Sequence, residues 1–253
     1  MTRADLAFAR LTYLEAEAAA KRDVVLILPV GAVEPHGPHL PLDTDLIIAG
    51  GMAEMAADLC RQAGIEAYVL NPLAYAVTDF ARGFGGAVSI ARDTASALVA
   101  EVCRALVGQG FRRIVLANAH LEPAHLDSLR AAVTRVKEAT GVEVLFPDIT
   151  SRRWGRMLTD EFRSGACHAG SFETSLVMAC APEAVRETER RSLPPNPVSL
   201  SRKIKEGVTG FKEAGGERAY FGAPADASRE EGLATLRTLA GILLTSIQEG
   251  RSE

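Results

Sequence analysis

Short apolar runs alternate with longer helical patterns along this chain, and this alternation constrains the fold more than any other feature. The apolar runs, each bounded by turn residues, lie at 23–30, 66–72, 112–119 and 143–149. Helical patterns are found at 46–62, 93–109, 122–139, 172–181 and 229–249. Strands that alternate with helices pair in parallel, because each helix returns the chain to the start of the next strand. The sequence therefore predicts an α/β fold with a mostly parallel β-sheet flanked by helices.

Length and composition predict one globular domain over residues 1–253. The chain has a mass of 26.9 kDa, with 47% hydrophobic and 24% charged residues, which is ordinary for a folded soluble protein. The last helix is expected to begin after Ser228, with Glu231 three residues later in the spacing of a capping box. The first 23 residues predict an amphipathic helix with interspersed charges rather than a signal peptide.

Charge and hydropathy exclude several classes of partner. The net charge of −4 and the pI near 5.8 give no basic field for nucleic acid. No apolar run reaches the roughly 18 residues of a membrane span. The four cysteines are widely spaced and include no C-x-x-C, so neither a zinc finger nor a disulfide framework is predicted. We expect a cytoplasmic protein.

The segment 191–226 has no clear periodicity and is rich in Pro, Gly, Ser and Lys. A segment of this kind and length forms a lid, an oligomer contact or simply a long connection, and the sequence does not choose among them.

Acidic and histidine residues gather in two short segments, GAVEPHGPHLPLDTD and ANAHLEP. The candidate ligands are Glu34, His36, Asp45, His120 and Glu122. These segments follow the runs 23–30 and 112–119, and ligands of parallel sheets collect at the carboxyl ends of the strands. Carboxylates and imidazoles that converge can hold two divalent ions about 3.5–4 Å apart. The pattern therefore predicts a two-metal hydrolase site.

Each candidate also has a structural alternative. Asp45 precedes a helical pattern and could cap it, and Glu122 could only favour the first turn of the helix at 122–139. His39 and His125 are interpreted as ordinary polar residues that could orient a ligand.

Three segments resemble the creatininase family of metal-dependent amidohydrolases: PVGAVEPHGPHLPLDTD, ANAHLEP and HAGSFETSLVMA. The resemblance covers about residues 20 to 182, with the three motifs in order. It implies a single-domain α/β sandwich that binds a pair of divalent ions, Zn²⁺ and/or Mn²⁺ with Fe²⁺ in some members. It also implies a homo-oligomer, often a hexamer.

The resemblance further assigns roles to residues. Glu34 and His120 would hold one metal, His36 and Glu122 the other, and Asp45 would bridge them, with Glu122 also counted among the catalytic residues. His168 would correspond to the family's proton-shuttling histidine, with a locally packed loop histidine as its alternative. Glu173 would be a metal ligand or a residue that supports one, with an alternative in which it only favours the start of the helix at 172–181.

Departures from the family pattern concern the substrate. Ser164 and Cys167 stand where creatininases proper have a tryptophan and a glutamate, and Leu121 stands where they tend to have tyrosine. A creatinine-specific lid is therefore not expected, and Leu121 is a candidate substrate contact. Trp154, the only tryptophan, is a candidate to cover a substrate ring, with core or interface packing as its alternative. The family's Pro-Gly-Thr turn corresponds to Gly85-Gly86-Ala87, a further departure.

The expected activity is hydrolysis of a non-peptide C–N bond in a small molecule, a cyclic amide or a formamide. A metal-bound hydroxide would attack the carbonyl carbon while His168 passes a proton to the departing nitrogen. The chain lacks the G-x-S-x-G, Walker-type and G-x-G-x-x-G motifs of other common enzyme classes. Two alternatives stay open: a peptidase that acts on a modified peptide, and a non-catalytic metal- or ligand-binding protein on the same scaffold.

Overall fold

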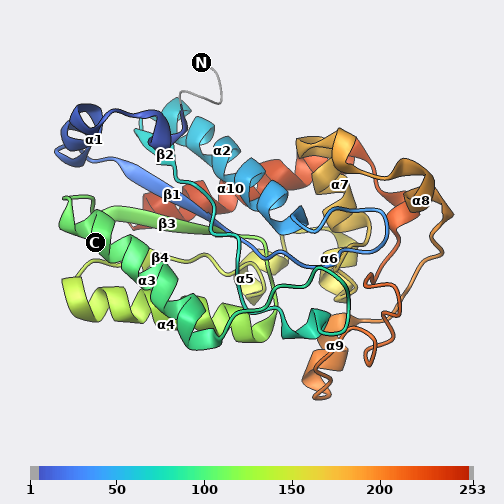
Figure 1. Cartoon of the computed structure of the whole chain (residues 1–253). Helices are drawn as coiled ribbons and strands as arrows, with labels where there is room; N and C mark the ends of the chain where they lie inside the picture. Colours follow the sequence, from blue (N-terminus) through green and yellow to red (C-terminus); the bar gives the residue numbers. More distant parts are fainter. Residues whose placement is uncertain (1–5, 251–253) are drawn as a thin grey trace.

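A four-stranded parallel sheet forms the centre of the computed structural model, which describes residues 6–250 (Figure 1). The strands lie in the order β2-β1-β3-β4. Their bounds are β1 Val25–Val30, β2 Ala67–Val69, β3 Arg113–Asn118 and β4 Val144–Leu145. β1 and β3 pair along their whole length, from Val25 opposite Arg113 to Val30 opposite Asn118. The predicted α/β class with a parallel sheet is confirmed.

Helices follow the strands and also form the last third of the chain. Their bounds are α1 Tyr13–Ala20, α2 Thr44–Gln62, α3 Arg92–Gly108, α4 Pro123–Thr140, α5 Arg152–Gly155, α6 Asp160–Ser164, α7 Ser171–Cys180, α8 Glu187–Ser192, α9 Leu200–Lys205 and α10 Arg229–Glu249. Short 3-10 helices are at Phe8–Arg10, Asp79–Ala81, Pro182–Ala184 and Pro224–Asp226.

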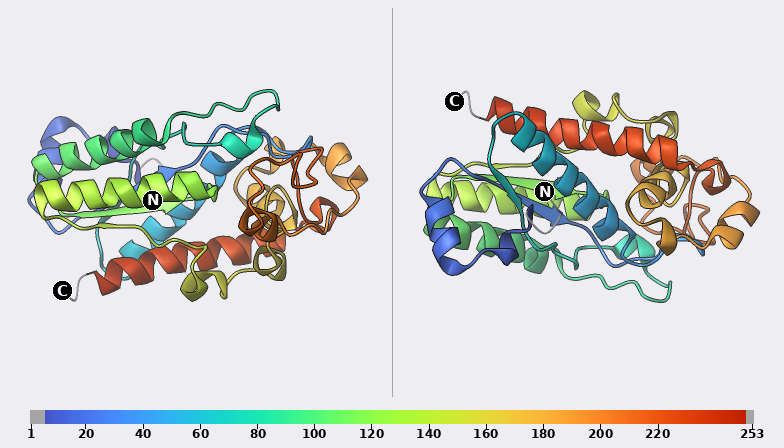
Figure 2. Two further views of the ribbon diagram at one scale, coloured as in Figure 1. Left: turned by 90° about the horizontal axis from the view of Figure 1, so that it is seen from below. Right: turned by 90° about the horizontal axis from the view of Figure 1, so that it is seen from above.

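The helices cover both faces of the sheet, so its central strands are buried on both sides (Figure 2). On one face α3 and α4 pack over Leu26 and Leu28 of β1. On the other face α2 and α10, with α7 beside them, pack over Val25 and Ile27. The side chains of β1 alternate between these two apolar clusters, as the two-residue period of a strand requires.

The long helices lie within about two residues of their predicted positions, whereas the edge strands are shorter than predicted. The run 66–72 forms strand structure only at Ala67–Val69, and the run 143–149 only at Val144–Leu145. Both runs contain a proline, Pro72 and Pro147, which has no N–H to donate to a sheet. An apolar run thus marked each strand correctly but overstated its length.

The predicted capping box before α10 is half present. The side chain of Ser228 accepts a hydrogen bond from the N–H of Glu231 at 3.1 Å. The carboxylate of Glu231 instead accepts from Ser175 Oγ on α7, at 3.3 Å. The predicted amphipathic helix over 1–23 is also shorter than expected, because α1 begins only at Tyr13; residues 1–5 lie outside the described part.

The segment 191–226 packs against the rest of the chain as a connection with a small apolar core of its own. Its residues Phe211 and Phe221 belong to a third cluster of buried apolar side chains, which also includes Leu200 of α9. The segment therefore adds a wall beside the carboxyl ends of the strands. Within residues 6–250, no helix is both long enough and apolar enough to cross a membrane.

Two glycines of α10 give a matched test of how it packs on α7. A Cβ at Gly232 would overlap the carbonyl of Ser175, whereas a Cβ at Gly241 would meet no atom within 4 Å. We expect Gly232→Ala to lower the free energy of unfolding by about 2 kcal/mol or more through overpacking. Gly241→Ala should raise it by about 0.5–1 kcal/mol, because alanine favours helix. Urea unfolding followed by circular dichroism measures both, and equal effects would contradict the packing.

Candidate metal centre

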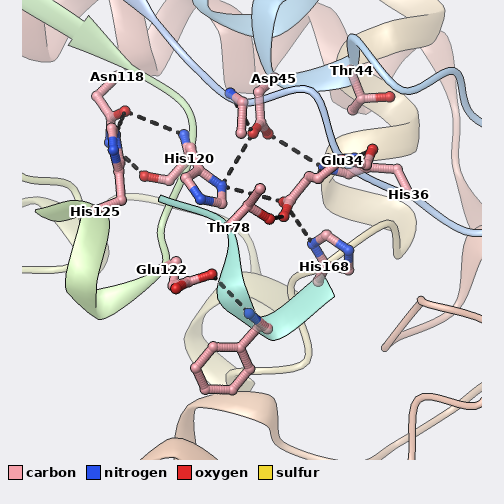
Figure 3. A network of polar contacts seen from close by, with 12 residues as sticks. Glu34, His36, Thr44, Asp45, Thr78, Asn118, His120, Glu122, His125 and His168 are labelled. Carbon is pink, nitrogen blue, oxygen red and sulfur yellow. Dashed lines mark hydrogen bonds and ion pairs between the residues drawn. The ribbon is translucent and has the colours of Figure 1, made fainter. Parts of the chain in front are cut away.

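The five predicted ligands lie together at the carboxyl ends of β1 and β3, where the sequence placed them (Figure 3). Loops after β1 and β3 carry Glu34, His36, His120 and Glu122, and the first turn of α2 carries Asp45. All five side chains are buried. The site is thus built from segments that are distant in sequence but meet at one edge of the sheet.

The position of Asp45 at the site depends on the close approach of the loop after β1 to the start of α2. A Cβ at Gly31 would lie only 2.7 Å from the Cβ of Asp45, so glycine is what allows this contact. The next residue, Ala32, donates its N–H to Asp45 Oδ2 at 3.1 Å. The N-cap residue of α2 is Asp43, and Asp45 lies inside the first turn, so Asp45 is not the cap of this helix.

Backbone carbonyls fix the orientation of both ligand imidazoles. His36 donates from Nδ1 to the carbonyl of Glu34 at 3.0 Å, and His120 donates from Nε2 to the carbonyl of Val77 at 2.8 Å. A carbonyl oxygen can only accept, so each ring carries its proton there and presents the lone pair of its other nitrogen to the site. Metal-binding histidines are commonly held in this way.

Asp45 lies between the two imidazoles. Its Oδ1 is 3.3 Å from His36 Nε2, and its Oδ2 is 3.1 Å from His120 Nδ1. Glu34 Oε1 lies 3.2 Å from the same nitrogen of His120. One ligand group is therefore Glu34, Asp45 and His120, and Asp45 also belongs to a second group, so its position suits a bridging ligand.

The second group contains Glu173, on the first turn of α7. Its Oε2 lies 3.6 Å from His36 Nε2 and accepts the N–H of Ala169 at 2.6 Å. Burial raises the pKa of Glu173 to about 8, against the effect of His36. The structure thus brings His36 together with Asp45 and Glu173, and the predicted pairing of His36 with Glu122 is not what it shows.

Glu122 lies at the rim of the ligand groups. Its two carboxylate oxygens accept the backbone N–H groups of Asp79 and Phe80, each at 3.1 Å. Burial raises the pKa of Glu122 to about 7, although these bonds and His120 act in the opposite direction. It belongs to none of the three groups within residues 6–250 that could hold a metal ion, the third of which is Glu34, His36 and His168. Glu122 is also the N-cap residue of α4, although its side chain makes no capping bond, so the alternative that it favours the start of this helix stays open.

The residues of both groups fit divalent ions. His36 Nε2 is buried and has no hydrogen-bond partner within the described part of the chain, although it faces three carboxylates. Burial alone would lower the pKa of His36, but Asp45, Glu173 and Glu34 raise it to about 10, so the site strongly favours a positive charge at this nitrogen. Buried carboxylates that converge on an imidazole nitrogen need a positive charge between them, and a divalent metal ion supplies it.

Substitution of the two glutamates distinguishes their roles. We expect Glu173→Gln to reduce bound metal from about two ions per chain to about one, because a neutral amide is a poor ligand for the second ion. Glu122→Gln should retain both ions and serves as the matched control. Inductively coupled plasma mass spectrometry on dialysed protein measures the ratio. Loss of metal from Glu122→Gln alone would reverse the assignment.

His168 faces the same site from the HAG loop. Its Nε2 donates to the carbonyl of Pro35 at 3.0 Å, so Nδ1 carries the lone pair, 3.9 Å from Glu34 Oε1. Phe211 stacks on the ring with centroids 4.2 Å apart. Burial and the neighbouring His36 lower the pKa of His168 to about 4. The ring is therefore a fixed neutral imidazole, and its unprotonated nitrogen is directed toward the ligands.

The two remaining histidines, His39 and His125, are buried beside the ligand residues. His125 Nε2 lies 2.9 Å from Asn118 Oδ1, and Asn118 donates from Nδ2 to the carbonyl of His120 at 2.6 Å. His39 Nε2 lies 2.8 Å from the hydroxyl of Thr174, the residue after Glu173. Both contacts act on residues at or beside ligands, which agrees with the orienting role considered for them.

Sequence reasoning missed Thr78 and Phe211. Thr78 is fully buried and donates its hydroxyl to Glu34 Oε2, which leaves Glu34 Oε1 for the site. A single threonine in a loop carries no recognisable signal. Phe211 lies in the unpatterned segment 191–226, and only the fold reveals that it reaches His168.

A family model described as "Creatinine amidohydrolase" matches residues 9–247. The chain belongs to the creatininase family. It is 30% identical over 213 residues to the mycofactocin precursor peptide peptidase of Mycolicibacterium smegmatis, covering 82% of this chain and 78% of that protein. It is 29% identical over 193 residues to the creatinine amidohydrolase of Pseudomonas putida, covering 69% and 72%. A solved structure described as "Creatininase Mn" shares the fold, with a TM-score of 0.71 at 23% identity over 97% of this chain and 98% of that one.

A cavity of about 750 Å³ opens above the ligand groups of this creatininase-family chain. Leu121 and Cys167, two positions where the sequence departs from creatininases proper, both line it. Trp154 does not line it, because this side chain is buried in the main core and contributes to a different cavity. The structure therefore favours the core alternative for Trp154 over the contact with a substrate ring.

Proposed function

We propose that this chain is a metal-dependent hydrolase that adds water across a non-peptide C–N bond of a small amide, a cyclic amide or a formamide. The observation that carries the proposal is the buried Nε2 of His36, which makes no hydrogen bond within the described residues although three carboxylates surround it. Such an atom is costly without a cation, and the bridging position of Asp45 suits a pair of ions.

Zn²⁺ or Mn²⁺ bound by these residues would supply Lewis acidity, lowering the pKa of water and polarising a carbonyl group. Glu34, Asp45 and His120 would hold one ion, and His36, Asp45 and Glu173 the other. Thr78 and the carbonyl of Val77 would keep Glu34 and His120 in place.

His168 would move the proton that the departing nitrogen needs. Its Nδ1 faces the ligand groups and is free to take a proton, while the bond from Nε2 to Pro35 holds the ring in one orientation. Phe211 covers the face of the ring and limits the access of water. General acid and base catalysis requires this combination of reach and fixed geometry.

The test is metal-dependent addition of water, detected by mass spectrometry. Protein stripped of metal and protein restored with Zn²⁺, Mn²⁺ or Fe²⁺ would be incubated with lactams, cyclic imides, formamides and short peptides. A gain of one water on an amide only after restoration supports the proposal. Full metallation without hydrolysis of any substrate would favour the non-catalytic binding protein instead.

A peptidase is the second candidate, and the size of the cavity favours it. About 750 Å³ exceeds what one small ring fills and lies in the range of sites for larger ligands. The similarity to a peptide peptidase points the same way. Cleavage of the short peptides in the same panel, with no turnover of lactams or formamides, would establish this branch.

The assembly of the chain also stays a prediction. By family resemblance we propose a homo-oligomer, a hexamer in particular; the cytoplasmic location expected from the sequence also stays a prediction. Light scattering coupled to size-exclusion chromatography measures the mass in solution, and a monomer at micromolar concentration would contradict the proposal.

A further inference from the structure

The wall of the site cavity carries a concentration of cationic side chains, although the chain as a whole has a net charge of −4. The cationic residues that line it are Arg130, Arg152, Arg156, Arg163 and Lys205. All are exposed, so they lie toward solvent, whereas the metal ligands in the same cavity are buried.

Two of these cations already have carboxylate partners. Arg130 pairs with Asp127 at 2.9 Å and also with Asp148, and Arg163 pairs with Asp160. Their charge is therefore largely compensated within the protein.

The other three cations have no such compensation. Arg152, Arg156 and Lys205 form no ion pair with any carboxylate within residues 6–250. Their neighbour Arg153, by contrast, pairs with Glu249 and belongs to a different cavity. The unpaired side chains of Arg152 and Arg156 thus face the site, whereas the paired side chain of Arg153 faces away from it.

Two separate elements supply the three cations. Arg152 begins α5 and Arg156 follows it, while Lys205 ends α9. The start of α9 is joined to the end of α6 by hydrogen bonds from Ser201 N to the carbonyl of Gly165, at 3.2 Å, and from Ser199 Oγ to that of Ser164, at 2.8 Å. Figure 1 shows α5, α6 and α9 on the side of the molecule where the strands end. The cations are therefore attached to a packed frame.

Apolar side chains lie in the same cavity as the ligand groups and these cations. They are Leu121, Leu126, Phe162, Leu200, Ile204 and Phe211. The cavity thus combines metal ligands, an apolar lining and uncompensated positive charge, and its volume of about 750 Å³ accommodates a molecule larger than a single ring.

We infer that the substrate carries a carboxylate, which Arg152, Arg156 and Lys205 bind while its amide lies at the metal centre. Guanidinium groups bind carboxylates through paired hydrogen bonds, and a field of one sign also speeds the arrival of an oppositely charged ligand. The inference rests on the proposed function, whose site it completes. The carboxylate belongs either to an N-acyl amino acid or to the C-terminus of a short peptide.

Matched substrate pairs test the inference. Each pair consists of an amide with a free carboxylate and the same molecule with a neutral carboxamide: N-formyl and N-acetyl amino acids in one arm, and di- and tripeptides with free or amidated C-termini in the other. For the metal-loaded protein, kcat/KM should be at least about tenfold higher for the acid. The arm that shows turnover identifies the source of the carboxylate.

Variants connect this preference to the three cations. In Arg152→Gln/Arg156→Gln and in Lys205→Gln, the preference for the acid should fall through a higher KM, while kcat and metal content stay unchanged. Arg153→Gln and Arg202→Gln are controls on the same two helices, because neither residue lines the cavity. Added salt should weaken the preference in the parent protein and have less effect in the variants.

The outcomes separate this inference from the proposed function. Equal turnover of acid and carboxamide, or a preference that the variants retain, overturns the carboxylate inference and leaves the hydrolase intact. If no pair is hydrolysed, calorimetric titration of the same pairs still tests the carboxylate inference. Tighter binding of the acid that Arg152→Gln/Arg156→Gln abolishes upholds the anion site, and equal binding of both members refutes it.

Discussion

Asp45→Asn is expected to remove most of the bound metal and to lower kcat/KM by at least about a thousandfold. Asp45 is the residue shared by both ligand groups, with one oxygen 3.3 Å from His36 Nε2 and the other 3.1 Å from His120 Nδ1. An amide cannot supply two anionic oxygens, so both ions lose a ligand at once. Metal analysis of the dialysed variant and turnover of the best substrate of the panel measure the two effects.

Asp43→Asn is the matched control, two residues earlier. Asp43 is exposed and its side chain makes no capping bond to α2, so the exchange removes a carboxylate without touching the site. It should retain metal and activity. If Asp45→Asn kept both ions and normal turnover, the bridging role would have to be abandoned.

His168→Gln is expected to lower kcat by about 10²–10⁴-fold while metal content stays full. Glutamine can still donate a hydrogen bond to the carbonyl of Pro35, as Nε2 of His168 does at 3.0 Å, but it cannot exchange a proton near neutral pH. The variant thus retains the shape of the loop and removes only the chemistry.

His168→Ala removes both the bond and the ring on which Phe211 stacks, and provides the comparison. If it loses activity while His168→Gln remains active, the histidine has only a structural role. If both lose kcat with KM nearly unchanged, the proton-transfer role is supported. Metal analysis of each variant shows whether a loss of activity arises from a loss of bound metal instead.

Periodicity and ligand chemistry predicted the sheet, its long helices and the place of the site. The apolar run at 23–30 is buried on both faces, and the charged residues after it could only collect at its carboxyl end. These features depend on local pattern, which a sequence displays directly.

The assignment of each ligand residue to one of the two ligand groups depended on geometry that no local sequence pattern encodes. Glu122 and Glu173 have the same chemistry, and each stands near the start of a helix. Only the docking of α7 against α2 decides that Glu173 lies 3.6 Å from His36 Nε2, while Glu122 accepts two backbone N–H groups elsewhere. For the same reason the sequence left two alternatives open for Trp154, because the direction of its side chain follows from how α5 packs.

The position of Phe211 was equally inaccessible to sequence reasoning. Segment 191–226 has no period, since it folds around its own small cluster and against other loops rather than along a sheet or helix face. The contact with His168 joins residues more than forty positions apart, and only the completed fold brings them together.

Burial of the ligands has a kinetic consequence. Glu34, His36, Asp45 and Glu173 are at most 4% exposed, and they come from loops and helices that pack on one another rather than from one flexible segment. Glu34, Asp45 and Glu173 also line the cavity of about 750 Å³, so an ion held by them meets solution only through this opening. A substrate that fills this cavity should therefore slow the release of metal to a chelator, so the supply of substrate would help to determine how much metal the enzyme keeps.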